Sequence, residues 1–116
     1  MTEPVIYHNP ACGTSRDTLA LMREQGLAPR VVEYLKTGWT RPQLEGLLQQ
    51  MNLTARDILR VRGTEAEPLG LTDHDVTQDR LLDAMVADPA LVERPIVVTA
   101  RGAALCRPKD RVLELI

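Results

Sequence analysis

The chain has 116 residues, which is enough for one hydrophobic core but not for two. Its 14 basic and 16 acidic residues leave a net charge of −2, which offers no electrostatic attraction to nucleic acid or to a membrane surface. No apolar run approaches the length of a membrane span, the first residues lack the features of a secretion signal, and two cysteines do not make a disulfide framework. We therefore expect a single cytoplasmic domain, monomeric, with no nucleic-acid or membrane partner.

The first third of the chain predicts a β-α-β unit. Residues 5–7 are a short run of β-branched and aromatic side chains, typical of a strand, and Asn9-Pro10 is a turn signal that ends it. Residues 16–25 follow a helical pattern that Gly26 is suited to end. Residues 30–35 then predict a second strand, and two strands joined by a helix within so short a stretch run parallel.

The middle of the chain, about residues 40–90, is predicted to be mainly helical. Thr40 and Gln43 have the spacing of a capping box, and the apolar side chains that follow have the spacing of one buried helix face: Leu44, Leu47, Leu48 and Met51. Thr54 is expected to open a short helix that runs through Leu59 into Arg60 and Arg62. Thr77 is expected to cap a further helix that stops near Pro89.

The last part of the chain returns to strands. Residues 95–99 and 103–106 are expected to pair as a hairpin around a turn at Arg101-Gly102, and residues 109–116 to close the chain as a short helix. The order β-α-β, helices, β-β-α predicts an α/β protein with a mixed sheet and a thioredoxin-like fold, in which residues 40–90 form a helical insertion.

Cys12 lies between the first strand and the first helix, where unpaired N–H groups and the helix dipole lower the pKa of a thiol and bind anions. His8 and Arg16, each four residues away, are expected to bring positive charge towards its sulfur. Gly13 lets the backbone approach a ligand. Ser15 stands where a second cysteine would complete a C-x-x-C pair, so an outside thiol would have to resolve any disulfide. The alternative is that Cys12 is simply a small buried side chain.

Three arginines lie beside apolar runs and are candidates for binding an oxyanion: Arg60, Arg94 and Arg107. In a thioredoxin-like fold, the bond between Arg94 and Pro95 would be cis and would face the cysteine, although most such bonds are trans. Each arginine alone could be an ordinary surface residue, but together they could supply the donors that a tetrahedral oxyanion needs. The remaining candidates for this role are Arg56, Arg62 and Arg101.

The other reactive side chains have simpler interpretations. Cys106 is either a buried structural thiol or a resolving cysteine, and the sequence context favours the first. His8 either packs in the interior or helps to lower the pKa of Cys12. His74, between two aspartates, is expected to be solvated. No cysteine and histidine spacing suits zinc and no glycine-rich phosphate motif is present, so we expect no metal and no bound cofactor.

Four motifs resemble those of a known family, the glutaredoxin-coupled arsenate reductases (the ArsC family), over essentially the whole chain. They are Tyr7-His8-Asn9-Pro10-x-Cys12-Gly13-Thr14-Ser15-Arg16, Ile58-Leu59-Arg60, Arg94-Pro95-Ile96-Val97-Val98-Thr99 and Leu105-Cys106-Arg107-Pro108. The first and last motifs are specific, whereas Ile-Leu-Arg alone is not. Some members of the family continue beyond the position of Ile116 with a longer tail.

The resemblance implies a thioredoxin-like fold in which Cys12 is the nucleophile, with His8 and Ser15 as helpers to its thiolate. Arsenate would be bound by three arginines and by the turn that follows the cysteine: Arg60, Arg94, Arg107, Gly13 and Thr14. It further implies that Cys12 attacks arsenate, that glutathione adds as a co-substrate, and that glutaredoxin, a transient partner, resolves the mixed disulfide, giving arsenite.

Two rival functions share this fold. One is a redox-sensing regulator that binds RNA polymerase (the Spx group), but such proteins carry a C-x-x-C switch that Ser15 removes here. The other is a glutathione-dependent reductase acting on a different substrate, against which the matches at Arg60 and Arg107 argue.

Overall fold

The computed structural model describes residues 3–116, and the chain divides into two compact units. The sheet unit consists of Met1–Thr37 and Arg94–Ile116, and the helical unit is Gly38–Glu93. The helical unit covers the stretch expected to be an insertion. The description of the whole chain as a single domain stays a prediction. Within residues 3–116, no helix combines the length and the apolar character needed to span a bilayer.

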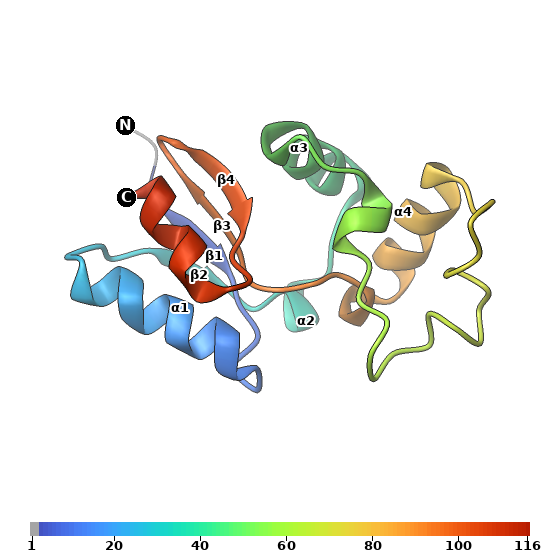
Figure 1. Ribbon diagram of the computed structural model, residues 1–116, viewed down its shortest axis with the longest axis horizontal. Coiled ribbons are helices and arrows are strands. Elements are labelled where there is room, and N and C mark those ends of the chain that lie inside the picture. Colours follow the sequence, from blue (N-terminus) through green and yellow to red (C-terminus); the bar gives the residue numbers. More distant parts are fainter. Residues whose placement is uncertain (1–2) are drawn as a thin grey trace. The chain divides into compact units, whose positions relative to one another are not determined.

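The sheet unit is built on four strands in the order β2-β1-β3-β4 (Figure 1). The strands are β1 (Val5–Tyr7), β2 (Arg30–Val32), β3 (Ile96–Thr99) and β4 (Gly102–Leu105). β2 runs parallel to β1, while β3 is antiparallel to both β1 and β4. The mixed sheet confirms the predicted α/β class and thioredoxin-like fold.

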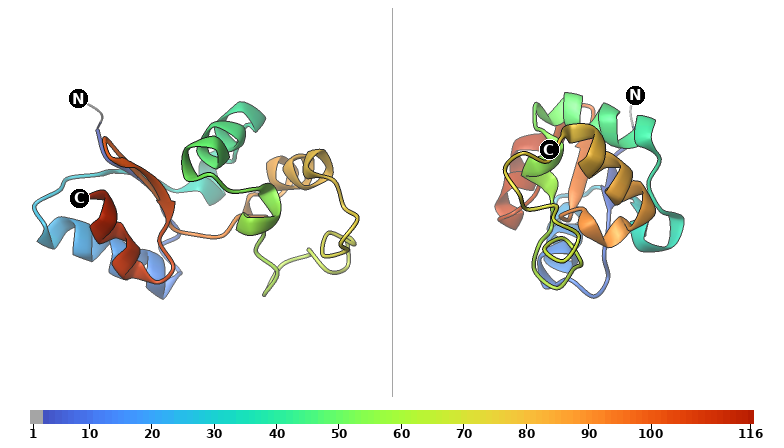
Figure 2. Two further views of the ribbon diagram at one scale, coloured as in Figure 1. Left: turned by 45° about the horizontal axis from the view of Figure 1, so that its top comes forward. Right: turned by 90° about the vertical axis from the view of Figure 1, so that its right-hand side faces the viewer.

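Two helices pack together over one face of this sheet, α1 (Gly13–Glu24) and the 3₁₀ helix η3 (Lys109–Leu115) (Figures 1 and 2). Apolar side chains from the sheet and both helices form one buried core: Ile6, Leu19, Met22, Val97, Cys106, Val112 and Leu115. Since Ile6 and Val97 are paired residues of β1 and β3, this core lies directly on the two central strands.

α1 begins three residues earlier than the sequence pattern indicates, at Gly13 instead of residue 16. The small polar residues there are weak helix formers, but the first turn of a helix needs no partner for its N–H groups, so they are tolerated. The N–H of Arg16 donates to the carbonyl of Cys12 at 3.0 Å and closes that turn. At the other end Gly26 has φ +86, the left-handed conformation predicted for it.

The second strand is shorter than predicted. It ends at Val32, and Tyr34–Thr37 form a one-turn helix, α2, instead of continuing the strand. The carbonyl of Glu33 accepts the N–H groups of Lys36 and Thr37 at 2.9 and 3.1 Å, so local hydrogen bonds replace the ladder there. The β-branched run indicated a strand but did not indicate where the chain turns away from the sheet.

The helical unit contains α3 (Arg41–Met51), η1 (Ala55–Ile58), α4 (Gln78–Ala87) and η2 (Pro89–Leu91), with α4 packed against the other three. The predicted capping box is present, because Thr40 and Gln43 each accept the other's backbone N–H through a side-chain oxygen at 3.3 Å. Thr77 caps α4 by accepting the N–H of Arg80 at 3.1 Å. Both helix starts therefore follow the sequence signals.

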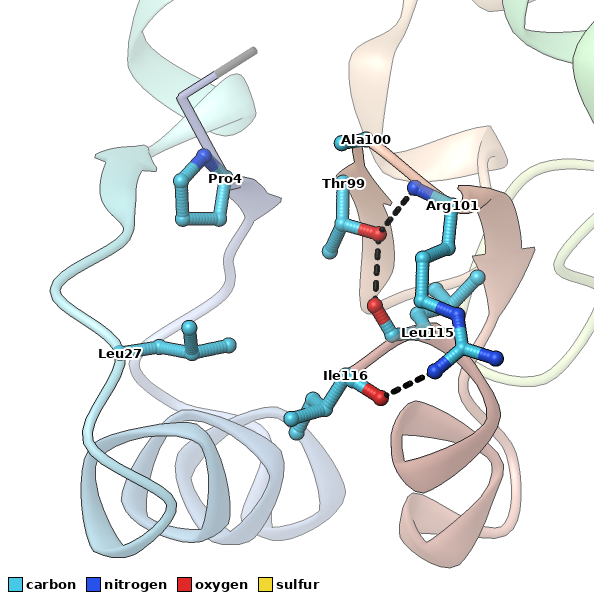
Figure 3. A pocket seen from close by; sticks show the side chains of 7 residues that line it. All are labelled: Pro4, Leu27, Thr99, Ala100, Arg101, Leu115 and Ile116. Carbon is cyan, nitrogen blue, oxygen red and sulfur yellow. Dashed lines mark hydrogen bonds between the residues drawn. The ribbon is translucent and has the colours of Figure 1, made fainter. Parts of the chain in front are cut away.

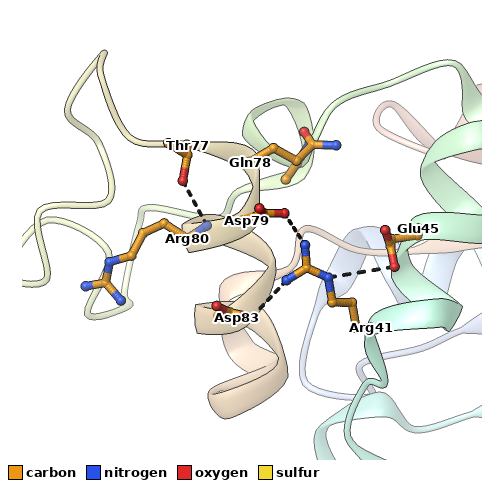
Figure 4. Close-up of polar contacts among 8 residues, drawn as sticks. Arg41, Glu45, Thr77, Gln78, Asp79, Arg80 and Asp83 are labelled. Atoms are coloured by element: carbon orange, nitrogen blue, oxygen red, sulfur yellow. Dashed lines mark hydrogen bonds and ion pairs between the residues drawn. The ribbon is translucent and has the colours of Figure 1, made fainter.

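An exposed ion-pair network joins α3 to α4 within the helical unit (Figure 4). The guanidinium of Arg41 pairs with Asp79, with Asp83 at 2.9 Å and with Glu45 at 3.7 Å. Because these carboxylates lie at the surface, the network fixes the geometry of the two helices more than it adds to stability.

Of the two other short helices that the sequence predicts, the closing one is present and the other ends earlier than expected. η1 ends at Ile58, and Leu59 instead pairs with Val92 in an isolated antiparallel bridge, so Arg60 does not end a helix. The backbone N–H of Arg60 donates to the carbonyl of Leu91 at 2.8 Å. The closing helix η3 is a 3₁₀ helix. These tertiary hydrogen bonds are made by residues far apart in sequence, which a local pattern does not reveal.

The core position of η3 is testable with one substitution made at two places in the same helix. Leu115 is 8% exposed within the core, whereas Leu113 is 47% exposed. We expect Leu115→Ala to lower the free energy of unfolding by about 2–5 kcal/mol, because it leaves a cavity. Leu113→Ala should change it by less than about 0.5 kcal/mol. Urea denaturation measures both, and equal losses would show that η3 does not bury Leu115 as described.

Candidate active site

The connection from β1 to α1 is a tight turn that ends in a cysteine. The N–H of Cys12 donates to the carbonyl of Asn9 at 3.0 Å, and the N–H of Ala11 donates to the side-chain Oδ1 of Asn9, also at 3.0 Å. Cys12 is the N-cap residue of α1, with extended backbone angles (φ −96, ψ 123). Its sulfur therefore lies where the unpaired N–H groups of a helix start gather, as the sequence predicted.

Three groups favour the thiolate form of Cys12 against the effect of burial. The thiol is 8% exposed, and burial by itself raises its pKa. The backbone N–H of Ser15, the charge of Arg94 and hydrogen bonds from Arg107 and Arg94 outweigh burial and lower the pKa below its ordinary value. Nη1 of Arg107 lies 3.8 Å from the sulfur. These contacts favour the interpretation of Cys12 as an activated thiol over that of a small buried side chain, and its role as nucleophile stays a prediction.

Strand pairing brings these two arginines to the cysteine. Tyr7, the last residue of β1, pairs with Ile96 of β3, and Ile96 pairs with Leu105, the last residue of β4. Arg94, just before β3, and Arg107, just after β4, therefore both lie at the edge of the sheet where β1 ends.

The two arginines are also linked to each other. Nη1 of Arg107 donates to the carbonyl of Arg94 at 3.0 Å. The peptide bond between Arg94 and Pro95 is cis, as predicted, and so is the bond between Arg107 and Pro108, which the sequence did not indicate. Arg94 and Arg107 consequently act on the sulfur as a connected pair.

His8 and Ser15 form a buried pair behind the cysteine. Nδ1 of His8 lies 2.7 Å from Oγ of Ser15, and these residues are 6% and 0% exposed. Burial lowers the pKa of His8, the charge of Glu33 partly opposes this, and Arg23 and Arg16 reinforce it. Burial therefore favours the neutral imidazole, which argues against the expectation that His8 brings positive charge to Cys12.

Ser15 contributes to the site in two separate ways. Its backbone N–H, in the first turn of α1, lowers the pKa of Cys12, while its hydroxyl oxygen contacts His8 and accepts the backbone N–H of Asn9 at 3.1 Å. His8 thus holds the side chain of Ser15, and the role of both residues as helpers to the thiolate stays a prediction.

Arg16 does not supply the charge expected of it. Its Nη1 donates to the carbonyl of Pro10 at 2.9 Å, so the side chain folds back over the turn. The guanidinium groups that lower the Cys12 pKa are those of Arg94 and Arg107. Arg16 lies one helical turn after Cys12 in the sequence. Its guanidinium nevertheless donates to the carbonyl of Pro10 instead of reaching the sulfur.

Gly13 and Thr14 begin α1 directly after the cysteine. Gly13 is exposed, and a Cβ built there would have only the Arg16 guanidinium within 4 Å, with Nη2 at 3.8 Å. The backbone at this point is therefore open to a ligand. Because α1 begins at Gly13, the N–H groups of Gly13 and Thr14 lie in its first turn, where helices bind anions. Their contact with substrate stays a prediction.

Arg60 belongs to the helical unit, and its predicted role in binding the oxyanion stays a prediction. Its Nε donates to the carbonyl of Arg62 at 3.1 Å, and the side chain is half-buried.

Two of the three alternative arginines have structural roles. Arg56 donates to the carbonyls of Asp73, His74 and Val76, and Arg101 donates to the carbonyl of Ile116 at 2.7 Å. Arg62 and His74 are exposed, and the structure thus confirms that His74 lies at the surface.

Cys106 is a structural thiol. It is fully buried in the core of the sheet unit, and burial raises its pKa to about 12. A thiol with so high a pKa forms almost no thiolate at neutral pH. Burial and the raised pKa thus favour the first of the two interpretations of Cys106, a structural thiol, over the resolving role.

Charge is divided unequally between the two units. The sheet unit has nine lysines and arginines against six acidic residues, whereas the helical unit has five against ten. The unit that carries Cys12 is thus positive even though the chain as a whole is negative, and it attracts anions. Among the described residues, no three histidine, cysteine or acidic side chains gather as metal ligands would.

An apolar pocket of about 210 Å³ lies at the opposite edge of the sheet, beside Pro4, which precedes β1, and the β3–β4 turn (Figure 3). Leu27, Leu115 and Ile116 supply much of its lining. Hydrogen bonds from Thr99 and Arg101 to the last two carbonyls of the chain close one side. Cys12 follows the other end of β1, so this pocket is separate from the thiol site.

Asn9 is the residue that the sequence reasoning undervalued. The pattern Asn-Pro was interpreted only as a break after the strand, but the Asn9 side chain is 6% exposed and holds the turn before Cys12. The signal was present, since asparagine at the first and proline at the second position are typical of a turn that the asparagine side chain stabilises.

Comparison with known proteins links this site to one family. The sequence model of the ArsC family matches residues 7–115. The chain is 52% identical over 112 residues to an arsenate reductase of Synechocystis sp., covering 97% of this chain and 80% of that protein. It is 47% identical over 116 residues to the arsenate reductase of Escherichia coli, covering 100% and 82%. The solved structure of an arsenate reductase from Vibrio cholerae superposes with a TM-score of 0.93 at 43% identity, over 98% of each chain.

The arginine pair should control the ionisation of Cys12. Arg107→Ala removes a donor that stabilises the thiolate but not the neutral thiol, so we expect the pKa of Cys12 to rise by about one unit. The rate of Cys12 alkylation by iodoacetamide, followed against pH, reports that pKa. Arg101→Ala removes an arginine of the same unit that bonds to Ile116 and should leave the profile unchanged. Identical pH profiles for Arg107→Ala and Arg101→Ala would contradict the conclusion that Arg107 lowers the pKa of Cys12.

Proposed function

Because this chain belongs to the ArsC family, we propose that it reduces arsenate to arsenite with the Cys12 thiolate as nucleophile. The observation that carries the proposal is the contact of 3.8 Å between Nη1 of Arg107 and the sulfur of Cys12 at the start of α1. An anionic nucleophile and an anionic substrate repel each other unless fixed positive groups hold both. A connected pair of arginines beside a helix N-terminus meets that need.

The first step forms a bond between sulfur and arsenic. The Cys12 thiolate attacks the arsenic of bound arsenate, and one oxygen takes up protons and leaves as water. Arg94 and Arg107 are positioned to stabilise the oxygens as charge redistributes. Gly13, Thr14 and Arg60 complete the proposed oxyanion site.

The second step requires a thiol from outside the chain. Only two cysteines are present, Ser15 replaces a local partner, and Cys106 is buried with a raised pKa. We therefore assign glutathione as co-substrate. Its sulfur joins that of Cys12 in a mixed disulfide, arsenic takes up the two electrons, and arsenite leaves. Glutaredoxin, as a transient partner in the cytoplasm, then reduces the mixed disulfide, and no bound cofactor is needed.

The two cysteines should differ completely in their importance for turnover. Cys12→Ser replaces the nucleophile with a hydroxyl that does not ionise at neutral pH, so arsenate reduction should be abolished. Cys106→Ala keeps the nucleophile and should retain activity in whatever fraction stays folded. The measurement is arsenate-dependent turnover with glutathione and glutaredoxin, with circular dichroism to confirm folding. Normal turnover by Cys12→Ser would refute the proposed function.

The arginines assigned to the oxyanion should determine the use of arsenate. Arg60→Ala and Arg107→Ala each remove a charge-assisted donor, worth about 1.5–3 kcal/mol, so kcat/KM for arsenate should fall by about ten- to one-hundred-fold. Arg62→Ala, two residues from Arg60 and exposed, is the matched control and should lose little. Phosphate and sulfate added as competitors report whether the site distinguishes arsenate from other tetrahedral anions. Unchanged constants for Arg60→Ala would place that residue outside the site.

A further inference from the structure

Asn9 is a buried polar residue whose hydrogen bonds all lie within the turn that presents the cysteine. It is 6% exposed and connects the end of β1 to the start of α1. Its side-chain oxygen, its carbonyl and its N–H each have a partner, namely Ala11, Cys12 and Ser15. Buried polar groups cost free energy unless paired, so a residue paired in three directions holds its neighbours tightly.

Two of these bonds set the position of Cys12. The carbonyl of Asn9 accepts the N–H of Cys12 at 3.0 Å and closes the turn, and Oδ1 accepts the N–H of Ala11 at 3.0 Å inside it. Pro10 at the second position has a backbone angle already suited to the turn. The side chain of Asn9 therefore supplies the bond to the backbone two residues on that asparagine and aspartate characteristically make in turns.

The third bond reaches the first turn of α1. The N–H of Asn9 donates to Oγ of Ser15 at 3.1 Å, and the same oxygen lies 2.7 Å from Nδ1 of His8. Ser15 is fully buried and is the third residue of α1. Asn9 is thus bonded both to the residue that carries the sulfur and to the helix turn that follows it.

We propose that Asn9 is a positioning residue that holds the turn carrying Cys12 against Ser15 at the start of α1. This inference rests on Cys12 being the reactive group of the proposed function. The hydrogen bonds of Asn9 reach Ala11, Cys12 and Ser15, so it acts through the turn and not on the sulfur itself. It keeps that sulfur at the helix N-terminus and within 3.8 Å of Nη1 of Arg107, and the strength of these interactions depends on distance and direction.

Arg16 is the other side chain that spans the turn, through its bond to the carbonyl of Pro10. That bond is exposed to water, which can replace the guanidinium at little cost, whereas the bonds of Asn9 are buried or partly buried. The alignment of the turn therefore depends on Asn9 far more than on Arg16.

Substitutions at Asn9 should change the ionisation of Cys12. Asn9→Ala removes Oδ1, and Asn9→Gln moves the amide one carbon further away, so in both we expect the pKa of Cys12 to rise by about one unit towards that of free cysteine. Asn9→Ser keeps an oxygen that can accept the N–H of Ala11 and should recover part of the shift. The pH profile of iodoacetamide alkylation at Cys12, resolved by peptide mass spectrometry, measures each variant.

A control separates positioning from a general loss of stability. Asn52 ends α3 in the left-handed conformation (φ 57) within the helical unit, so Asn52→Ala strains the backbone without touching the turn. It should lower the melting temperature and leave the Cys12 profile unchanged. If folded Asn9→Ala or folded Asn9→Gln has the wild-type profile, the inference is overturned, whatever happens to its melting temperature.

The experiment distinguishes this inference from the proposed function because alkylation needs neither arsenate nor glutathione. An ordinary pKa for Cys12 in the unmodified chain would overturn the activated thiolate itself. A low pKa in the unmodified chain that Asn9→Ala does not change would overturn only the role of Asn9. In the arsenate assay, Asn9→Ala should lose more activity at acid pH than at alkaline pH. At alkaline pH the Cys12 thiol ionises even when its pKa is raised.

Discussion

The contact between Nη1 of Arg107 and the sulfur of Cys12, 3.8 Å apart at the start of α1, is the interaction on which the site depends. Burial alone would raise the pKa of that thiol, and the first turn of α1, with Arg94 and Arg107, reverses the effect. The sulfur of Cys12 is shielded from water and must still carry a negative charge. This is possible only if the N–H groups and arginines that stabilise the thiolate stay fixed in position. The buried residues around the turn, His8, Asn9 and Ser15, serve that purpose.

The sheet explains how arginines far along the chain reach a cysteine near its beginning. Since β3 is antiparallel to β1 and β4 is antiparallel to β3, the segments before β3 and after β4 lie at the edge where β1 ends. Arg94 lies two residues before β3, and Arg107 lies two residues after β4. The core beneath, with Ile6 and Val97 at its centre, fixes the register, because a slip of one residue would turn these side chains away from the helices.

The unequal charges of the two units fit the chemistry proposed for the site. A positive sheet unit favours the approach of an oxyanion and stabilises the thiolate, while the acidic helical unit keeps the whole chain negative. The chain also separates its two thiols by environment, since Cys12 is held at a helix start with a lowered pKa and Cys106 lies in the core with a raised one. One fold thereby keeps one thiol reactive and the other inert.

The local sequence determined the start of α3 at Thr40, the end of α1 at Gly26, the place of Cys12 at a helix N-terminus and the absence of a neighbouring thiol at Ser15. These features follow from backbone angles and hydrogen bonds between residues a few positions apart, which residue types reveal directly. Only the tertiary structure decided that Arg107 and not Arg16 reaches the sulfur, that His8 is buried with a lowered pKa and that Asn9 holds the turn. Strand pairing and burial set those properties, and both depend on residues that are distant in the chain.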